Sequence, residues 1–567
     1  MSHIIDIRIQ SKLRRLWLIL LGLSLLVAGC QPAVNPSGQT TATPTGVVES
    51  PTAVPPTALP SPSPTLTPTP DPTPTLRPPS IWAAPYLPAV LPQAVQLANG
   101  VEWASSEDSA AARLEVGEGQ VVGQWVYALV APFPTIPDGV TLAELKDAWQ
   151  GKLEEGPFAG LPLLIDESTR GMLNALWGEP GSGAVRVLPA DQLLDTAWAG
   201  QPAWGIVPFE ALESRWKVLE VQGQSPLHKD FDQASYGLTV PISLSGGDSQ
   251  ALLQATSLTN RDPDKLTTVI LTGVTALVRA TAEVMRRKGL TYPGQDIGPW
   301  LREADILHIN NEVPFDPKCP QPNPNQVGLV FCSRPEYIEL LEDIGTDVVD
   351  LSGDHFADFG PQAMIYTLDL YNEKGIPHFG GGYTEADGRQ PLLLEHNGNK
   401  IAFLGCNAKG GGYATARGDK PGAVECDYDL LAQQIADVKA EGYLPIVTVQ
   451  DIEYYTYVPQ PRLIEDFHKI ADAAPVIVSG NQAHQPHGME FYNGTFIHYG
   501  LGNLFFDQYY MGWPTAHAFI DRHVFYDGRY LGTELLAIRF VDYARPVPAS
   551  VEDRQELLQH AFDASLW

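Results

Sequence analysis

The chain has 567 residues, 44% of them hydrophobic, and its 66 acidic and 36 basic residues give a formal net charge of −30. This charge argues against nucleic acid or an anionic lipid surface as a partner bound through bulk electrostatics, and it indicates a solvated, self-repelling surface. The length is too great for one ordinary hydrophobic core, so two or three domains are expected.

The first thirty residues have the pattern of a bacterial export signal. Lys12, Arg14 and Arg15 precede an apolar run over residues 16–27, which is too short to span a bilayer comfortably. The sequence VAGC follows at residues 27–30, ends at Cys30 and resembles the bacterial lipobox. The resemblance implies a lipoprotein signal peptide over 1–29, a diacylglyceryl group on Cys30 and a place on the outer face of the cell membrane. An ordinary secretory signal with an incidental cysteine is the alternative.

Residues 30–80 are dominated by Pro, Thr, Ser and Ala, with repeated Thr-Pro pairs. Such a stretch carries too few large apolar side chains to bury a core and favours extended polyproline-type conformations. We therefore expect a disordered, semi-rigid stalk that holds the folded part away from the membrane.

Residues 95–245 alternate strand-like and helix-like segments, for example 125–130, 142–149 and 161–166, which predicts a small α/β domain. The order of segments around 203–219 resembles part of a periplasmic solute-binding domain. The resemblance implies a ligand between two lobes, although no short motif fixes its identity. A recognition or spacer domain with an empty cleft is the alternative.

Several apolar runs between 266 and 542 each end in polar residues. Buried strands of an α/β sheet build a site in this way, because their carboxyl ends converge on one crevice. The runs predict one polar site assembled from distant loops, and the last residues, 543–567, are expected to form a C-terminal extension. The runs are 268–273, 304–312, 348–355, 401–407, 445–451 and 475–484.

Four blocks of this region, at 304–312, 350–360, 479–490 and 499–506, resemble the CapA family of poly-γ-glutamate capsule synthesis proteins. The resemblance implies a calcineurin-like metallophosphatase fold, a layered α/β/β/α sandwich. It also implies a site for one or two divalent cations (Mn, Fe or Zn), which would polarise a phosphoryl oxygen and activate a bound water.

The sequence departs from the family pattern at several expected ligands. The first strand is followed by Gly273-Val274 where the family has Gly-Asp, so a bridging carboxylate is missing. In one interpretation Asp354 replaces it, while His355 and His484 ligate or act as acid and base in a weakened single-metal or metal-free site. In the other, the polar residues only satisfy loop ends by hydrogen bonding. The candidate ligands are Asn310, Glu312, Asp354, His355, Asn481 and His484, and the candidate catalytic residues are Glu312, Asp354, His355 and His484.

Four further cysteines lie in the region expected to fold. An even number outside the cytoplasm favours disulfides, and the spacing suggests Cys319 with Cys332 and Cys406 with Cys426, although three pairings are possible.

These features predict an extracytoplasmic lipoprotein that acts in the synthesis, export or retention of an anionic capsule polymer such as poly-γ-glutamate. A metal-dependent phosphoesterase or related hydrolase and a solute-binding surface protein are the alternatives. The expected partners are the membrane, through the N-terminal lipid, and an anionic envelope polymer or capsule machinery. Because the chain is acidic, direct binding of polyglutamate requires a local basic patch or a bridging cation.

Overall fold

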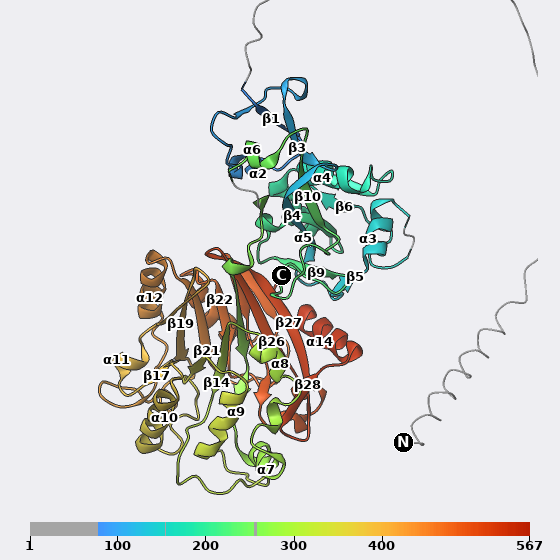
Figure 1. Cartoon of the computed structure of the whole chain (residues 1–567). Coiled ribbons are helices and arrows are strands. Elements are labelled where there is room, and N and C mark those ends of the chain that lie inside the picture. The colour runs from blue at the N-terminus through green and yellow to red at the C-terminus, as the bar shows by residue number, and fades with distance from the viewer. Residues whose placement is uncertain (1–77, 153–154, 255–257) are drawn as a thin grey trace, which may run out of the picture. The chain divides into compact units, whose positions relative to one another are not determined.

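The computed structural model describes residues 78–152, 155–254 and 258–567. These described residues form one compact unit (Figure 1). The predicted signal peptide, the lipid site at Cys30 and nearly all of the predicted stalk lie outside the described residues. Within those residues, no helix combines the length and the apolar character needed to cross a bilayer.

The first part of the unit is built on an eleven-stranded mixed sheet with the order β2-β1-β3-β10-β4-β8-β6-β7; β5, β9 and β11 pair beside this path. Its long central strand β4 pairs antiparallel with β10, β8 and β9. The strands are β1 (Ser80–Ala83), β2 (Glu102–Trp103), β3 (Ala112–Val116), β4 (Gln120–Pro132), β5 (Gly139–Val140), β6 (Leu163–Ile165), β7 (Val185–Val187), β8 (Trp204–Pro208), β9 (Trp216–Val221), β10 (Thr239–Ser245) and β11 (Leu258–Thr259). The helices are α2 (Val90–Ala94), α3 (Leu142–Trp149), α4 (Glu167–Trp177), α5 (Leu193–Ala199) and α6 (Ser249–Leu252).

The second part contains two larger sheets. A nine-stranded sheet has the order β16-β15-β14-β12-β26-β27-β28, with β13 and β25 beside it, and a six-stranded sheet has the order β18-β19-β21-β22-β24-β23. The nine strands are β12 (Leu266–Thr272), β13 (Val274–Thr275), β14 (Ile306–Asn311), β15 (Val348–Asp350), β16 (His378–Phe379), β25 (Asn503–Phe505), β26 (His517–Tyr526), β27 (Arg529–Val541) and β28 (Arg545–Pro548). The six are β18 (Leu392–His396), β19 (Asn399–Asn407), β21 (Leu444–Gln450), β22 (Ile477–Gly480), β23 (Met489–Tyr492) and β24 (Thr495–His498), and a small ribbon joins β17 (Gly381–Gly382) to β20 (Gly422–Ala423).

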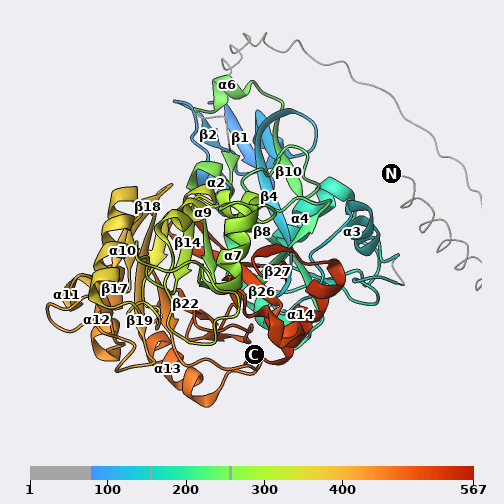
Figure 2. The same ribbon diagram turned by 90° about the horizontal axis from the view of Figure 1, so that it is seen from below.

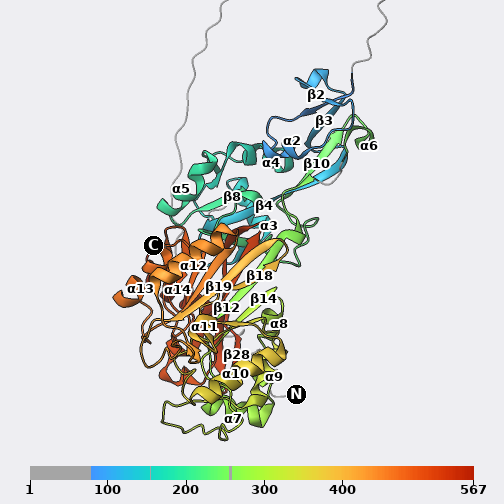
Figure 3. The same cartoon turned by 90° about the vertical axis from the view of Figure 1, so that its left-hand side faces the viewer.

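Helices cover the outer faces of these two sheets. They are α7 (Arg279–Lys288), α8 (Gly298–Arg302), α9 (Ile338–Asp343), α10 (Pro361–Lys374), α11 (Glu385–Gly388), α12 (Tyr428–Ala440), α13 (Pro461–Ala471) and α14 (Val551–Asp563). Figure 2 shows α12 and α13 beside the six-stranded sheet, and Figure 3 shows strands of both sheets between this pair and the group α8 to α10.

Three hydrophobic clusters define the layers. Val269, Phe403 and Ile446 belong to a cluster between the two sheets. Met285 and Leu340 join α7 and α9 to the nine-stranded sheet, and a third cluster packs α12 and α13 on the six-stranded one. A sheet that is apolar on both faces needs another layer packed on each face. The predicted α/β/β/α class is confirmed.

Two structural features extend past the predicted domain limits. The edge strand β28 continues the nine-stranded sheet beyond residue 542, and α14 packs on the same sheet through Leu557 and Phe562. At the other end, β1 places residues before 95 in the first sheet. The limits 95–245, 266–542 and 543–567 stay predictions.

Both cysteine pairs favoured by their spacing are joined in the structure. Cys319 is bonded to Cys332, and Cys406 to Cys426. Each disulfide closes a short loop next to a strand end that carries polar residues.

The helix α12 begins at an aspartate cap. The Asp427 side chain accepts a hydrogen bond of 3.1 Å from the Leu430 backbone N–H, one of the four N–H groups that a helix start leaves unpaired. We expect Asp427→Ala to lower the free energy of unfolding by about 1 kcal/mol and Asp427→Ser to restore most of it. Urea unfolding followed by circular dichroism measures both, and equal losses in the two variants would contradict the capping role.

A half-buried ion pair joins the segment after β9 to β27 of the nine-stranded sheet. His228 Nε2 lies 2.9 Å from Glu534 Oε1, and Arg522 and Glu220 also face this pair. Burial opposes protonation of His228, but the hydrogen bond and the charge of Glu534 raise its pKa above the ordinary value. Burial likewise opposes the charge on Glu534, yet His228 and Arg522 lower its pKa.

This pair gives the unfolding free energy a pH dependence. Folding raises the pKa of His228, so protonated His228 stabilises the folded state. This stabilisation is complete below the unfolded pKa of about 6.5, and it is lost as pH rises through the folded pKa. Glu534 stays ionised over this interval. We expect the stability advantage of the native chain over His228→Gln to shrink as pH rises. Urea unfolding at several pH values measures the difference, and parallel curves for the two proteins would contradict it.

Candidate metal site

The carboxyl ends of neighbouring parallel strands bring three potential ligands together. Glu312 follows β14, and Asp354 and His355 follow β15, which pairs parallel with β14. One donor atom from each of the three residues lies within 4.8 Å of the others. Glu312 is 1% and Asp354 3% exposed, so the two carboxylates are held close together away from solvent. Two carboxylates and an imidazole suit a divalent cation such as Mn²⁺, Fe²⁺ or Zn²⁺.

A glycine makes this close approach possible. A Cβ at Gly353 would lie 2.7 Å from both Cα and the carbonyl oxygen of Glu312. Any larger residue would push apart the loops after β14 and β15, and Asp354 would move away from Glu312.

Hydrogen bonds fix both carboxylates. Gln450, at the end of β21, donates from Nε2 to Asp354 Oδ1 at 3.0 Å and to Glu312 Oε1 at 3.3 Å. The other oxygen of Asp354 forms an ion pair with Lys409, whose ammonium group also lies 4.5 Å from the ring centre of Tyr413. One side chain of the six-stranded sheet thus bridges carboxylates that come from the nine-stranded sheet.

The charges of the cluster interact strongly. Burial, with the neighbouring Asp354 charge, raises the pKa of Glu312 well above its usual range. Burial alone would also raise the pKa of Asp354, but His355 and Lys409 lower it. For His355, burial opposes protonation, yet the Asp358 hydrogen bond and the charges of Glu312 and Asp354 raise its pKa to about 9. The cluster therefore attracts positive charge.

The orientation of His355 is set by a carboxylate and a disulfide loop. His355 Nδ1 lies 2.7 Å from Asp358 Oδ2, which also accepts a 2.7 Å hydrogen bond from the Phe331 backbone N–H. The Phe331 ring packs 4.8 Å from the imidazole, and the next residue, Cys332, is bonded to Cys319. With Nδ1 engaged, Nε2 is the nitrogen left for a ligand.

Of the other three predicted residues, Asn310 lies in β14, and Asn481 and His484 lie on the segment after β22. Asn310 donates to the Asn481 backbone carbonyl at 3.1 Å, and Asn481 donates to Asp350. His484 Nδ1 lies 2.8 Å from Asn503 Oδ1, its Nε2 lies 3.8 Å from Glu453, and burial lowers its pKa. The Oδ1 atoms of Asn310 and Asn481 are buried without a hydrogen-bond partner among the described residues. Such atoms indicate room for a polar ligand or water.

Three contributors were missed by sequence reasoning. Gln450 ends a predicted strand, so the rule of polar strand ends could have identified it. Asp358 sits three residues after His355, a spacing that by itself also suits a turn. Lys409 precedes the glycine run 410–412, and no local pattern there signals a site. The ammonium group of Lys409 reaches Asp354 only through the folded loop after β19.

Two stacked sheets between helices, with carboxylates and an imidazole at convergent strand ends, define this part of the chain as a layered α/β protein with a candidate cation site. Residues 268–508, which include the whole cluster, match the family model described as "Bacterial capsule synthesis protein PGA_cap". Through this segment, the chain is similar to the CapA family of capsule synthesis proteins.

Two curated relatives are similar to just under half of this chain. "Capsule biosynthesis protein CapA" of Bacillus anthracis is 26% identical over 261 residues, which cover 45% of this chain and 62% of that relative. "PGA biosynthesis protein CapA" of Bacillus subtilis (strain 168) is 26% identical over 279 residues, covering 48% and 71%. The chain thus spans less than two thirds of the length of the B. anthracis relative.

Solved structures give weaker likenesses. Haemophilus influenzae NAD nucleotidase (NadN) has a TM-score of 0.31 at 8% identity, covering 53% of this chain and 57% of that one. An ABC-type phosphate transport receptor from Vibrio cholerae has a TM-score of 0.24 at 13% identity, covering 30% and 89%. The assignment of the layers rests on strand pairing and core packing.

Proposed function

We propose that the chain acts in the synthesis, export or retention of an anionic capsule polymer such as poly-γ-glutamate. The match of residues 268–508 to the capsule synthesis family carries this proposal, because the matched segment contains Glu312, Asp354 and His355. A divalent cation held there would offer an anionic polymer a local positive charge on a chain whose net charge is −30.

Deletion of the gene in its own organism tests this role. Washed cells are hydrolysed in acid and the glutamate released from surface polymer is measured. We expect deletion to lower the yield and the native gene to restore it, whereas a gene with Glu312→Gln and His355→Asn should fail to do so. The exposed Glu373, on α10, supplies a matched control, Glu373→Gln. Unchanged surface polymer after deletion would refute the proposal.

A second candidate is a metal-dependent phosphoesterase or related hydrolase, favoured by the Glu312, Asp354 and His355 donor set. A bound cation would supply Lewis acidity and a more acidic water. Asp358 orients His355, Gln450 holds the two carboxylates, and Lys409 places a cationic group beside Asp354. Hydrolysis of bis(p-nitrophenyl) phosphate with added Mn²⁺, lost with chelator and in Glu312→Gln, would support this activity. Equal rates in the native chain and the variant would refute it.

The anchored location is part of the proposal. A lipid on Cys30 would place the protein on the outer face of the membrane, where capsule polymer is assembled or retained. We expect Cys30→Ala to move the protein from the membrane fraction to the soluble fraction, and intact mass measurement to show the diacylglyceryl group only on the native chain. Membrane retention of Cys30→Ala would contradict lipid anchoring.

A further inference from the structure

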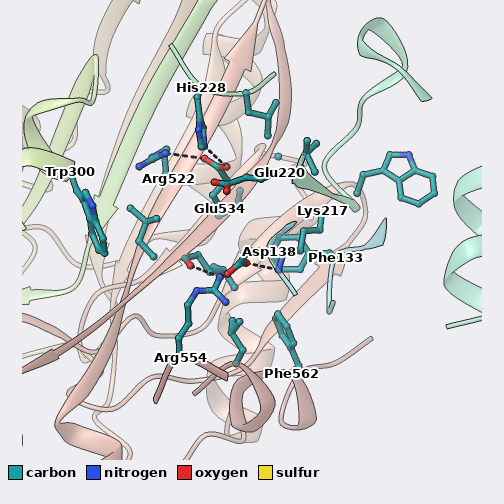
Figure 4. A pocket seen from close by; sticks show the side chains of 18 residues that line it. Phe133, Asp138, Lys217, Glu220, His228, Trp300, Arg522, Glu534, Arg554 and Phe562 are labelled. Carbon is teal, nitrogen blue, oxygen red and sulfur yellow. Dashed lines mark hydrogen bonds and ion pairs between the residues drawn. The ribbon is translucent and has the colours of Figure 1, made fainter. Parts of the chain in front are cut away.

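A polar cavity lies between the first sheet and the nine-stranded sheet, within the compact unit (Figure 4). Its volume is about 310 Å³, at the small end for ligand sites. Lys217 and Glu220 reach it from β9, Arg522 and Glu534 from β26 and β27, and Arg554 from α14. It is distinct from the Glu312, Asp354 and His355 cluster, because it shares no lining residue with that site.

The cavity contains charges of both signs. Glu534 faces His228 and Arg522, and Asp138 Oδ1 accepts from Lys217 Nζ at 2.9 Å and from Arg554 Nη2 at 2.8 Å (Figure 4). Three basic side chains, Lys217, Arg522 and Arg554, match three carboxylates, Asp138, Glu220 and Glu534. The lining is therefore formally neutral with His228 uncharged, in a chain of net charge −30.

Two of these charged side chains, Arg554 and Glu220, have polar atoms that make no hydrogen bond to the described residues. Lys217 Nζ is fully used, since Thr135 O, Ile136 O and Asp138 accept its three hydrogens. Arg554 uses only Nη2, toward Asp138 and the Leu535 carbonyl, so its Nε and Nη1 donate to none of the described residues. The carboxylate of Glu220 likewise makes no hydrogen bond or ion pair within residues 78–152, 155–254 and 258–567. Its charge nevertheless acts on Arg554, because burial lowers the pKa of Arg554 and the charge of Glu220 opposes this shift.

The remaining wall is apolar. It includes Phe133, Trp300, Leu536, Leu558 and Phe562. A simple anion at Arg554 would lie near the charge of Glu220, and a simple cation at Glu220 would lie near Arg554; each would meet repulsion in a partly buried space. A molecule that carries both charges avoids this cost.

We propose that this cavity binds a free α-amino acid with an apolar side chain, whose carboxylate pairs with Arg554 and whose ammonium group pairs with Glu220. The side chain then packs among Phe133, Leu558 and Phe562. Arg–carboxylate pairing supplies directional hydrogen bonds, and a small zwitterion satisfies both uncommitted groups at once. This inference does not depend on the capsule role.

Isothermal titration of the full chain with three probes of similar shape tests the proposal. L-leucine carries both charges, leucinamide lacks the carboxylate, and 4-methylpentanoate lacks the ammonium group. We expect L-leucine to bind and the other two to bind at least about tenfold more weakly, since each loses one charged hydrogen-bonding partner. No heat from L-leucine at roughly 10 mM, or equal binding of 4-methylpentanoate or leucinamide, overturns the proposal.

Two variants link binding to the cavity. Glu220→Gln breaks no internal hydrogen bond, so it should fold normally and bind L-leucine at least about tenfold more weakly, while 4-methylpentanoate should lose nothing. Glu556→Gln is the matched control on α14, outside the cavity, and should leave binding unchanged. Arg554→Gln should also abolish binding, but because it breaks the Asp138 pair, the Glu220 variant decides the question. Unchanged L-leucine affinity in Glu220→Gln overturns the assignment.

Discussion

We expect Glu312→Gln to lower the affinity of the chain for Mn²⁺ by about 100-fold or more. Glu312 is one of only two carboxylates in the 4.8 Å group, and a neutral amide oxygen is a much weaker ligand than a carboxylate. The fold should survive, because the glutamine side chain has the same shape and its oxygen can still accept from Gln450. Isothermal titration with Mn²⁺, after removal of bound metal with chelator, measures the change.

Two comparisons make the result specific. His355→Asn should give a loss of the same order, because it removes the imidazole ligand and leaves both carboxylates in place. Glu373→Gln changes the net charge by the same amount as Glu312→Gln but lies on an exposed part of α10, so its Mn²⁺ affinity should equal that of the native chain. Equal Mn²⁺ affinity in Glu312→Gln and the native chain would contradict the candidate metal site.

We expect Asp507→Ala to lower the free energy of unfolding by about 3–5 kcal/mol. The side chains of Arg279 and Asp507 are 9% and 6% exposed, and Asp507 Oδ1 accepts from both Nε and Nη2 of Arg279. Asp507 Oδ2 also accepts from the Ala280 backbone N–H at 2.9 Å. Removal of this carboxylate leaves a buried guanidinium without its counter-charge between the rings of Phe331 and Phe506. Urea unfolding measures the loss.

The double variant Arg279→Met with Asp507→Leu separates the charge effect from packing. Because both charges are removed together, it should lose far less than Asp507→Ala. A loss under about 1 kcal/mol in the single variant would show that water or another group replaces the carboxylate, contrary to the burial of the pair.

Much of the architecture could be predicted from local pattern. Each apolar run that ended in polar residues became a buried strand, and parallel pairing of β14 with β15 put Glu312 and Asp354 at one edge, as the polar strand ends indicated. The hydrogen-bond partner of His484 could not be predicted in this way. It sits on the expected loop, but its ring is engaged by Asn503, a partner that only the folded chain brings near.

The remaining parts of the site depend on contacts between distant segments. Lys409 reaches Asp354 from a loop 55 residues away, and Gln450 reaches it across 96 residues. No periodicity within a short window carries such information. The edge strand β28 could not be predicted either. Its four residues include two prolines and resemble a loop, and only the pairing with β27 makes them a strand.

The Cys319–Cys332 disulfide lies next to a residue that positions His355 in the candidate site. Phe331, which precedes Cys332, supplies both the backbone N–H bonded to Asp358 and the ring packed on His355. Such bonds form in oxidising compartments and remain open where thiols are kept reduced. A newly made chain in a reducing compartment therefore has every ligand residue but lacks the covalent tie that holds Phe331 in place. We therefore expect the contacts of Phe331 with His355 and Asp358 to be complete only once Cys319 and Cys332 are joined.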